Sequence, residues 1–114
     1  MTAKLLPCPN RANCVCSEDS RSKYYIDAFL FKNNSLKHLE ALVLKHFKNA
    51  KLIKKNDDYI SFEFQSAFFK FVDDVEFRIN KGKVEVRSAS RKGYSDLGAN
   101  RKRIEKIRTL YMNT

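Results

Sequence analysis

The sequence predicts an α+β domain, in which an antiparallel sheet of about five strands carries two helices on one face. Three observations lead to this fold class. Short runs rich in Val, Ile, Phe and Tyr alternate between apolar and polar side chains, as strands with one buried face do. Four of these runs follow one another with only short turns between them. One helical repeat precedes these four runs and another follows them, which predicts the order β-α-β-β-β-β-α.

The N-terminal part of the chain is predicted to be an arm, a strand and a helix. Residues 1–22 are punctuated by Pro and Asn, so we expect an extended arm, followed by a single α+β domain over 23–114. The aromatic run 24–31 predicts the first strand. Apolar residues at helical spacing predict a helix over 36–48, with Ser35 as its N-cap.

The middle of the chain predicts four consecutive strands. We expect them over 51–55, over 59–65, within 68–79 and over 83–90, the last two joined by a hairpin turn at 80–82. In the second of these strands Ile60, Phe62 and Phe64 share one face.

A loop over 90–98 and a closing helix over 99–112 complete the chain. Asp96 is the expected N-cap of this helix. Its expected buried stripe is Leu97, Ile104, Ile107 and Tyr111. The complete order matches one half of the TATA-binding-protein-like topology, and a topological match carries no function.

The composition limits the classes of protein to consider. The chain has 114 residues, 43% hydrophobic and 32% charged, which fits one folded domain rather than a disordered chain. No apolar run approaches the ~20 residues that cross a bilayer, and the N-terminal segment is too short for a signal peptide, so we expect a cytoplasmic protein. The net charge of +10 favours nucleic acid, anionic lipid or an acidic partner.

Three segments together carry a family resemblance. The first is Cys8-Pro9 with Asn13-Cys14-Val15, the second is FVDDVEF at 71–77, and the third is VRSASRKGYSDLGANRKRI at 86–104. The chain resembles the family called domain of unknown function 1499 along nearly its whole length, most closely in the third segment. The resemblance implies no activity, because the family is uncharacterised. It implies that relatives include exported or membrane-anchored proteins, although this chain shows no such segment.

The third segment, which we call the arginine-rich segment, is the main candidate site. Arg87 and Arg91 are four residues apart on a strand and so share a face, and the segment continues into a helix start, which attracts anions. We therefore expect a non-enzymatic binding or interaction domain that contacts an anionic ligand or an acidic partner. The candidate residues are Arg87, Ser88, Ser90, Arg91, Tyr94, Ser95, Asp96, Asn100, Arg101 and Arg103.

Three alternatives remain open for this segment. In a structural role, acidic residues of neighbouring strands neutralise the arginines and the segment only fixes the last helix to the sheet; these are Asp73, Asp74, Glu76 and Glu85. In an enzyme, the same place takes an anionic metabolite, with Asp96 or a cysteine as base. Nucleic-acid binding through the basic helix is disfavoured, because the outward strand face mixes both signs of charge.

The cysteines of the arm are the second candidate. Cys8 and Cys14 could form a disulfide or a thiol pair, or all three cysteines, with Cys16, could simply be buried. A zinc site is disfavoured, because it needs about four ligands and only His38 and His46 lie elsewhere in the chain to complete it. We predict no metal and no cofactor.

Overall fold

The computed structural model describes residues 4–32, 36–66 and 70–114. Two helices and six strands form the described part. In chain order they are β1 (Cys14–Cys16), β2 (Phe29–Leu30), α1 (Lys37–His46), β3 (Ala50–Lys55), β4 (Tyr59–Gln65), β5 (Val72–Asn80), β6 (Lys83–Ser90) and α2 (Ala99–Met112). The expected α+β class is confirmed.

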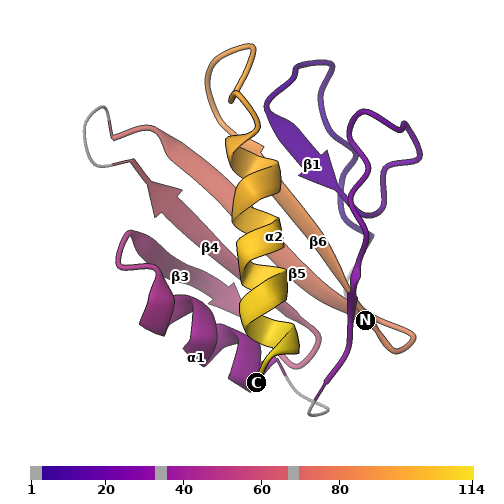
Figure 1. Cartoon of the computed structure of the whole chain (residues 1–114), viewed down its shortest axis with the longest axis vertical. Coiled ribbons are helices and arrows are strands. Elements are labelled where there is room, and N and C mark those ends of the chain that lie inside the picture. Colours follow the sequence, from indigo (N-terminus) through magenta and orange to yellow (C-terminus); the bar gives the residue numbers. More distant parts are fainter. Residues whose placement is uncertain (1–3, 33–35, 67–69) are drawn as a thin grey trace.

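The strands form one antiparallel sheet in the order β1-β6-β5-β4-β3, and β2 pairs with the start of β6. Both helices lie against one face of this sheet, with α2 running across it (Figure 1). The order is consistent with the TATA-binding-protein-like arrangement. We call the helix-covered side the helix face and the other side the open face.

The main core lies on the helix face. Alternation along β4 turns Ile60, Phe62 and Phe64 inward, where they meet Val75 and Phe77 of β5. From α2 this core receives Ile104, Ile107 and Tyr111, all fully buried. The prediction that Leu97 is the fourth buried residue of that stripe is wrong. The helix begins only at Ala99, after Gly98 at φ 81°, so Leu97 lies in the loop and outside the helical repeat.

Two strands differ from expectation, and both differences lie near the arm. Of the predicted strand 24–31, only β2 is a strand in the structure. Tyr24 and Tyr25 instead belong to a turn, in which their backbone N–H groups both donate to the carbonyl of Arg21. The arm, predicted to be irregular, contributes β1, whose Cys14 pairs with Ala89 of β6. The sheet therefore has six strands rather than about five. The predicted N-cap Ser35 lies outside the described residues.

The arm packs on the open face and builds a second, smaller core. This cluster consists of Leu5, Cys8, Cys14, Cys16, Tyr24 and Ala89, with Tyr59 beside it. Cys8 and Cys14 are joined by a disulfide. Cys16 is a buried free thiol, and burial raises its pKa. Disulfides persist in oxidising compartments, so this bond does not favour the expected cytoplasmic location, which stays a prediction.

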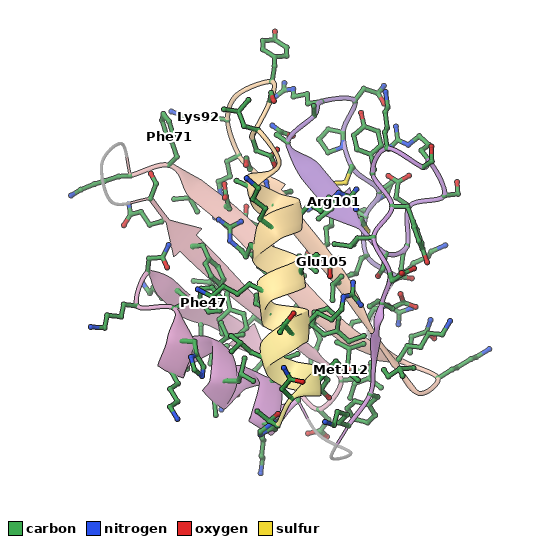
Figure 2. The ribbon with its side chains drawn as sticks, viewed as in Figure 1. Phe47, Phe71, Lys92, Arg101, Glu105 and Met112 are labelled. Carbon is green, nitrogen blue, oxygen red and sulfur yellow. A yellow bond between two sulfur atoms is a disulfide. The ribbon has the colours of Figure 1, made fainter. Side chains whose placement is uncertain are left out.

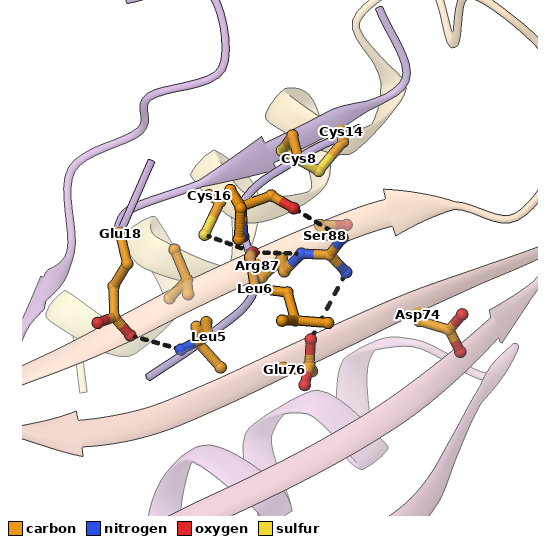
Figure 3. Close-up of polar contacts among 12 residues, drawn as sticks. Leu5, Leu6, Cys8, Cys14, Cys16, Glu18, Asp74, Glu76, Arg87 and Ser88 are labelled. Carbon is orange, nitrogen blue, oxygen red and sulfur yellow. Dashed lines mark hydrogen bonds and ion pairs between the residues drawn. A yellow bond between two sulfur atoms is a disulfide. The ribbon is translucent and has the colours of Figure 1, made fainter. Parts of the chain in front are cut away.

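Buried carboxylates of Glu18 and Asp19 hold the arm in place. Glu18 accepts the backbone N–H of Leu5 at 3.1 Å and the Nε of Arg78 at 2.8 Å (Figure 3 shows the contact with Leu5). Asp19 accepts the backbone N–H of Cys8 at 2.9 Å and two N–H groups of Arg21 through its other oxygen. The Arg21 hydrogen bonds hold the pKa of Asp19 well below its usual range. Burial raises the pKa of Glu18, but the bonds from Arg78 and Leu5 outweigh it and the pKa is lowered.

The arm is expected to detach in acid before the sheet unfolds. A lowered carboxylate pKa stabilises the folded state above the unfolded pKa, near 4, and this contribution disappears as the pH falls through the folded value. Hydrogen exchange at neutral pH and at a series of values below about pH 4 should therefore show protection at the Leu5 and Cys8 amides falling as the pH approaches the lowered carboxylate pKa values, while β4 amides such as Phe62 stay protected. Equal loss at Phe62 and Cys8 would contradict this prediction.

No helix within the described ranges is long and apolar enough to cross a membrane.

Candidate functional site

The candidate residues of the arginine-rich segment divide between the two faces of the sheet. Side chains alternate along β6, so Arg87 points to the open face, whereas Ser88 and Ser90 point toward α2. The ten residues that the sequence proposed as one site therefore do not converge.

On the open face the arginines have partners within the chain. Arg87 donates from Nε to the Leu6 carbonyl at 2.9 Å and lies 3.6 Å from the Glu76 carboxylate (Figure 3). Arg91 donates to both oxygens of Asp74 at 2.8 Å and to Glu63 at 2.8 Å, and the Asp74 bonds raise its pKa. For these two residues the structure shows the internal neutralisation that the structural alternative requires.

On the helix face a fully buried amide, that of Asn100, connects four segments. Its Oδ1 accepts the hydroxyl of Ser88 at 2.6 Å. Its Nδ2 lies within hydrogen-bonding distance of three acceptors, the carbonyl of Asn13 (3.0 Å), Ser90 Oγ (2.9 Å) and Asp96 Oδ2 (2.7 Å). Asn100 thus links α2 to the arm, to β6 and to the loop before the helix, and no part of its side chain faces solvent.

The start of α2 differs from expectation. Asp96 was predicted as N-cap, but the N-cap position belongs to Gly98. Asp96 instead reaches the helix from two residues earlier: Oδ1 accepts the Gly98 N–H at 2.8 Å and Oδ2 accepts the Asn100 N–H at 3.1 Å. The chain's own carboxylate therefore occupies the positive end of the helix, where the sequence suggested an anionic ligand.

Three candidate site residues with large side chains remain, and their environments differ. Arg103 donates to Ser88 and Asn100, and pairs with Asp73 at 2.7 Å. Arg101 is partly exposed at the start of α2, where its Nη2 approaches the Lys23 carbonyl at 3.5 Å (Figure 2). Tyr94 is exposed at the loop and lies beneath Arg11. Of the three, Arg103 lines a cavity at the start of α2.

This cavity, of about 390 Å³, lies where the ends of β5 and β6 meet the loop before α2. We call it the α2 cavity. Four predicted residues line it: Ser90, Ser95, Asp96 and Arg103. The other polar lining residues were not predicted as site residues from the sequence: Asn49, Ser66, Asp73 and Lys92. Of these four residues, Lys92 could have been predicted from the sequence, because it lies within the arginine-rich segment.

Three serine hydroxyls of the α2 cavity share one arrangement. Ser66 accepts the Phe71 backbone N–H (2.9 Å), Ser95 accepts the Leu97 N–H (3.2 Å) and Ser90 accepts the Asn100 side-chain amide (2.9 Å). Each oxygen accepts a bond, and none of the three hydroxyls donates one to the residues that the structure describes, so each O–H proton is available to a ligand. Such a lining suits a ligand that carries acceptors, above all an anion.

The charged residues that line the α2 cavity are two carboxylates and two cations. Asp73 pairs with Arg103, and Asp96 accepts N–H groups of α2. Lys92 is exposed at the rim and has no carboxylate partner among the described residues. Nowhere in the described ranges do three or more His, Cys, Asp or Glu side chains gather as they would around a metal ion.

Comparison with known proteins gives one family. A family model described as protein of unknown function (DUF1499) matches residues 4–110, a range that includes all three segments on which the resemblance rests. Neither the curated proteins nor the solved structures yield a match.

Proposed function

The chain belongs to the DUF1499 family of proteins of unknown function, and from its own geometry we propose a non-enzymatic binding domain that holds a small anionic ligand in the α2 cavity. The observation that carries the proposal is the set of three hydroxyls, on Ser66, Ser90 and Ser95, with protons left to donate. They come from three different parts of the chain and line the same cavity. A carboxylate or a phosphate is the natural acceptor for such donors.

The size and charge of the cavity define the ligand class. About 390 Å³ lies within the range of roughly 300–1,000 Å³ that small-molecule sites occupy. Lys92 supplies a positive charge that has no carboxylate partner among the described residues, so the proposed ligand is an anion. Phe71 and Val72 add an apolar wall, which suits a short hydrocarbon part.

Binding is favoured over acid–base chemistry, the second class of function considered for this place. A general base needs a lone pair free to take a proton. Asp96 already accepts three N–H groups and Asp73 is paired with Arg103. The thiol and the disulfide lie in the small core of the open face, which the sheet separates from the α2 cavity.

The proposal is tested by titration calorimetry with a panel of probes: inorganic phosphate, acetate, pyruvate and a short phosphate monoester. We expect at least one to bind, and we expect Lys92→Ala and Ser95→Ala each to weaken its binding by about tenfold, the loss of one charge-assisted hydrogen bond. Neither residue takes part in the Asn100 network.

Lys102→Ala is the matched control, since it removes an exposed lysine of α2 that does not line the cavity. It should leave the affinity unchanged within about twofold. Equal affinity in the wild type and in both cavity variants would place the ligand elsewhere and refute the proposal.

A further inference from the structure

Two large apolar side chains protrude from the loop between β6 and α2. Tyr94 is 84% exposed and Leu97 is 88% exposed, more than any other large hydrophobic residue of the described chain. We call residues 92–98 the loop tip; it lies at one end of the molecule, at the top of Figure 1. A soluble domain gains nothing from holding both side chains in water, so the loop tip is a candidate interaction surface.

The backbone that holds the Leu97 side chain outward is strained. Leu97 has φ 53°, a left-handed conformation that is unfavourable for a leucine. Several hydrogen bonds fix it there: the Leu97 N–H to Ser95 Oγ, the Gly98 N–H to Asp96 Oδ1, and the Asp96 N–H to the Ala12 carbonyl of the arm. Strain that the surroundings impose in this way is typical of functional loops.

Cations surround the loop tip. Lys92 belongs to it, Arg101 lies one helical turn beyond Leu97, and Arg11 of the arm lies 5.7 Å from the centre of the Tyr94 ring. Figure 2 shows Lys92 and Arg101 at this same end of the molecule. Between positions 91 and 102 Asp96 is the single acidic residue, and both of its oxygens accept N–H groups of the helix start. The exposed charge at this end is therefore positive.

We propose that the loop tip docks on an anionic membrane surface, with Tyr94 and Leu97 inserted among the lipid headgroups and the surrounding cations against the lipid phosphates. The combination of an aromatic, an aliphatic and basic side chains is the one that interfacial segments use. Charge complementarity selects anionic lipid. A protein partner needs a patch of roughly 800 Å² on each side, more than two protruding side chains provide, whereas a fluid bilayer closes around a small tip.

The inference shares Lys92 with the proposed ligand site but can be tested apart from it. Neither Tyr94 nor Leu97 lines the α2 cavity, so their replacement tests membrane docking without removing a cavity residue. Failure of one proposal leaves the other standing.

The experiment is sedimentation of the full chain with vesicles of phosphatidylcholine, with and without phosphatidylglycerol. We expect wild-type protein to bind the vesicles that contain phosphatidylglycerol and the double variant Tyr94→Ser, Leu97→Ser to bind them at least about tenfold more weakly, through the lost apolar burial. The variant keeps the net charge of +10, so the difference excludes simple attraction of a basic protein.

Leu30→Ser is the matched control, because Leu30 is also exposed (65%) but lies on β2, which pairs with the opposite end of β6. It should bind like the wild type. Equal binding by the double variant and by this control, or wild-type protein that remains in the supernatant at low salt, would overturn the proposal.

A second measurement reports the orientation directly. The chain has no Trp, so Tyr94→Trp introduces a single indole at the loop tip, which can be excited apart from the remaining tyrosines. Its emission should shift to shorter wavelength on addition of the anionic vesicles, while Leu30→Trp should not shift. A shift of the Leu30→Trp emission alone would show that another face meets the lipid and would refute docking by the loop tip.

Discussion

Replacing Asn100 by alanine is expected to lower the free energy of unfolding by about 3 kcal/mol, although alanine is the better helix former. The reason is the position of the side chain, which is fully buried and hydrogen-bonded to the arm, to β6 and to the loop before α2. Removal leaves the Asn13 carbonyl and the Ser88 hydroxyl with fewer partners in a region that water does not reach, which costs about 1–3 kcal/mol for each unsatisfied group. Urea denaturation of the two proteins measures the difference.

Two further variants separate the network from the helix. Lys102→Ala changes an exposed residue two positions further along α2 and should alter the free energy of unfolding by less than about 0.5 kcal/mol. Asn100→Asp keeps the shape but replaces the amide donor by an acceptor that faces Asp96 Oδ2 at about the present 2.7 Å. At neutral pH it should destabilise more than alanine does, and the difference should shrink in acid, where the introduced carboxyl is protonated. Similar stability of all three variants would refute the network.

Asn100 also shows why the sequence could not define the site. Polar and basic residues at a helix start predict an anion site, and from the sequence Asn100 looked like one of its donors. Its partners are 87 residues away at Asn13 and 12 away at Ser88, and nothing in the local pattern brings them together. Whether a polar side chain faces a ligand or the protein interior depends on this tertiary arrangement.

Regular elements were easier to predict than the site. The strands 59–65 and 83–90 and the helix 99–112 have the predicted bounds, because apolar alternation and helical spacing arise from the same faces that become buried. Leu97 was misplaced because the helical spacing continues by chance across Gly98, where the left-handed backbone ends the repeat. Ser66, which follows β4, had no sequence signal, since its place in the cavity depends on where β4 ends relative to α2.

The second large effect is expected where the arm meets the sheet, on replacement of Glu18. The side chains of Glu18 and Arg78 are 5% and 11% exposed, and the two oxygens of the carboxylate accept the guanidinium's Nε and Nη2. Glu18→Met should lower the free energy of unfolding by about 3 kcal/mol, because the mostly buried guanidinium keeps its charge after it loses this carboxylate. Chemical denaturation gives the value. Glu105→Met, which breaks the solvent-exposed pair with Arg108, should cost less than about 1 kcal/mol.

The decisive comparison is the double variant Glu18→Met, Arg78→Met. If the cost of the single change comes from the buried guanidinium charge that has lost the Glu18 carboxylate, removal of that charge should restore most of the stability, as replacement of a buried ion pair by apolar side chains of similar volume often does. If the cost comes instead from the lost bond to the Leu5 N–H and from loosening of the arm, the double variant should be as unstable as the single one. The two outcomes differ by more than the error of the measurement, so the experiment decides whether charge compensation or arm attachment makes Glu18 important.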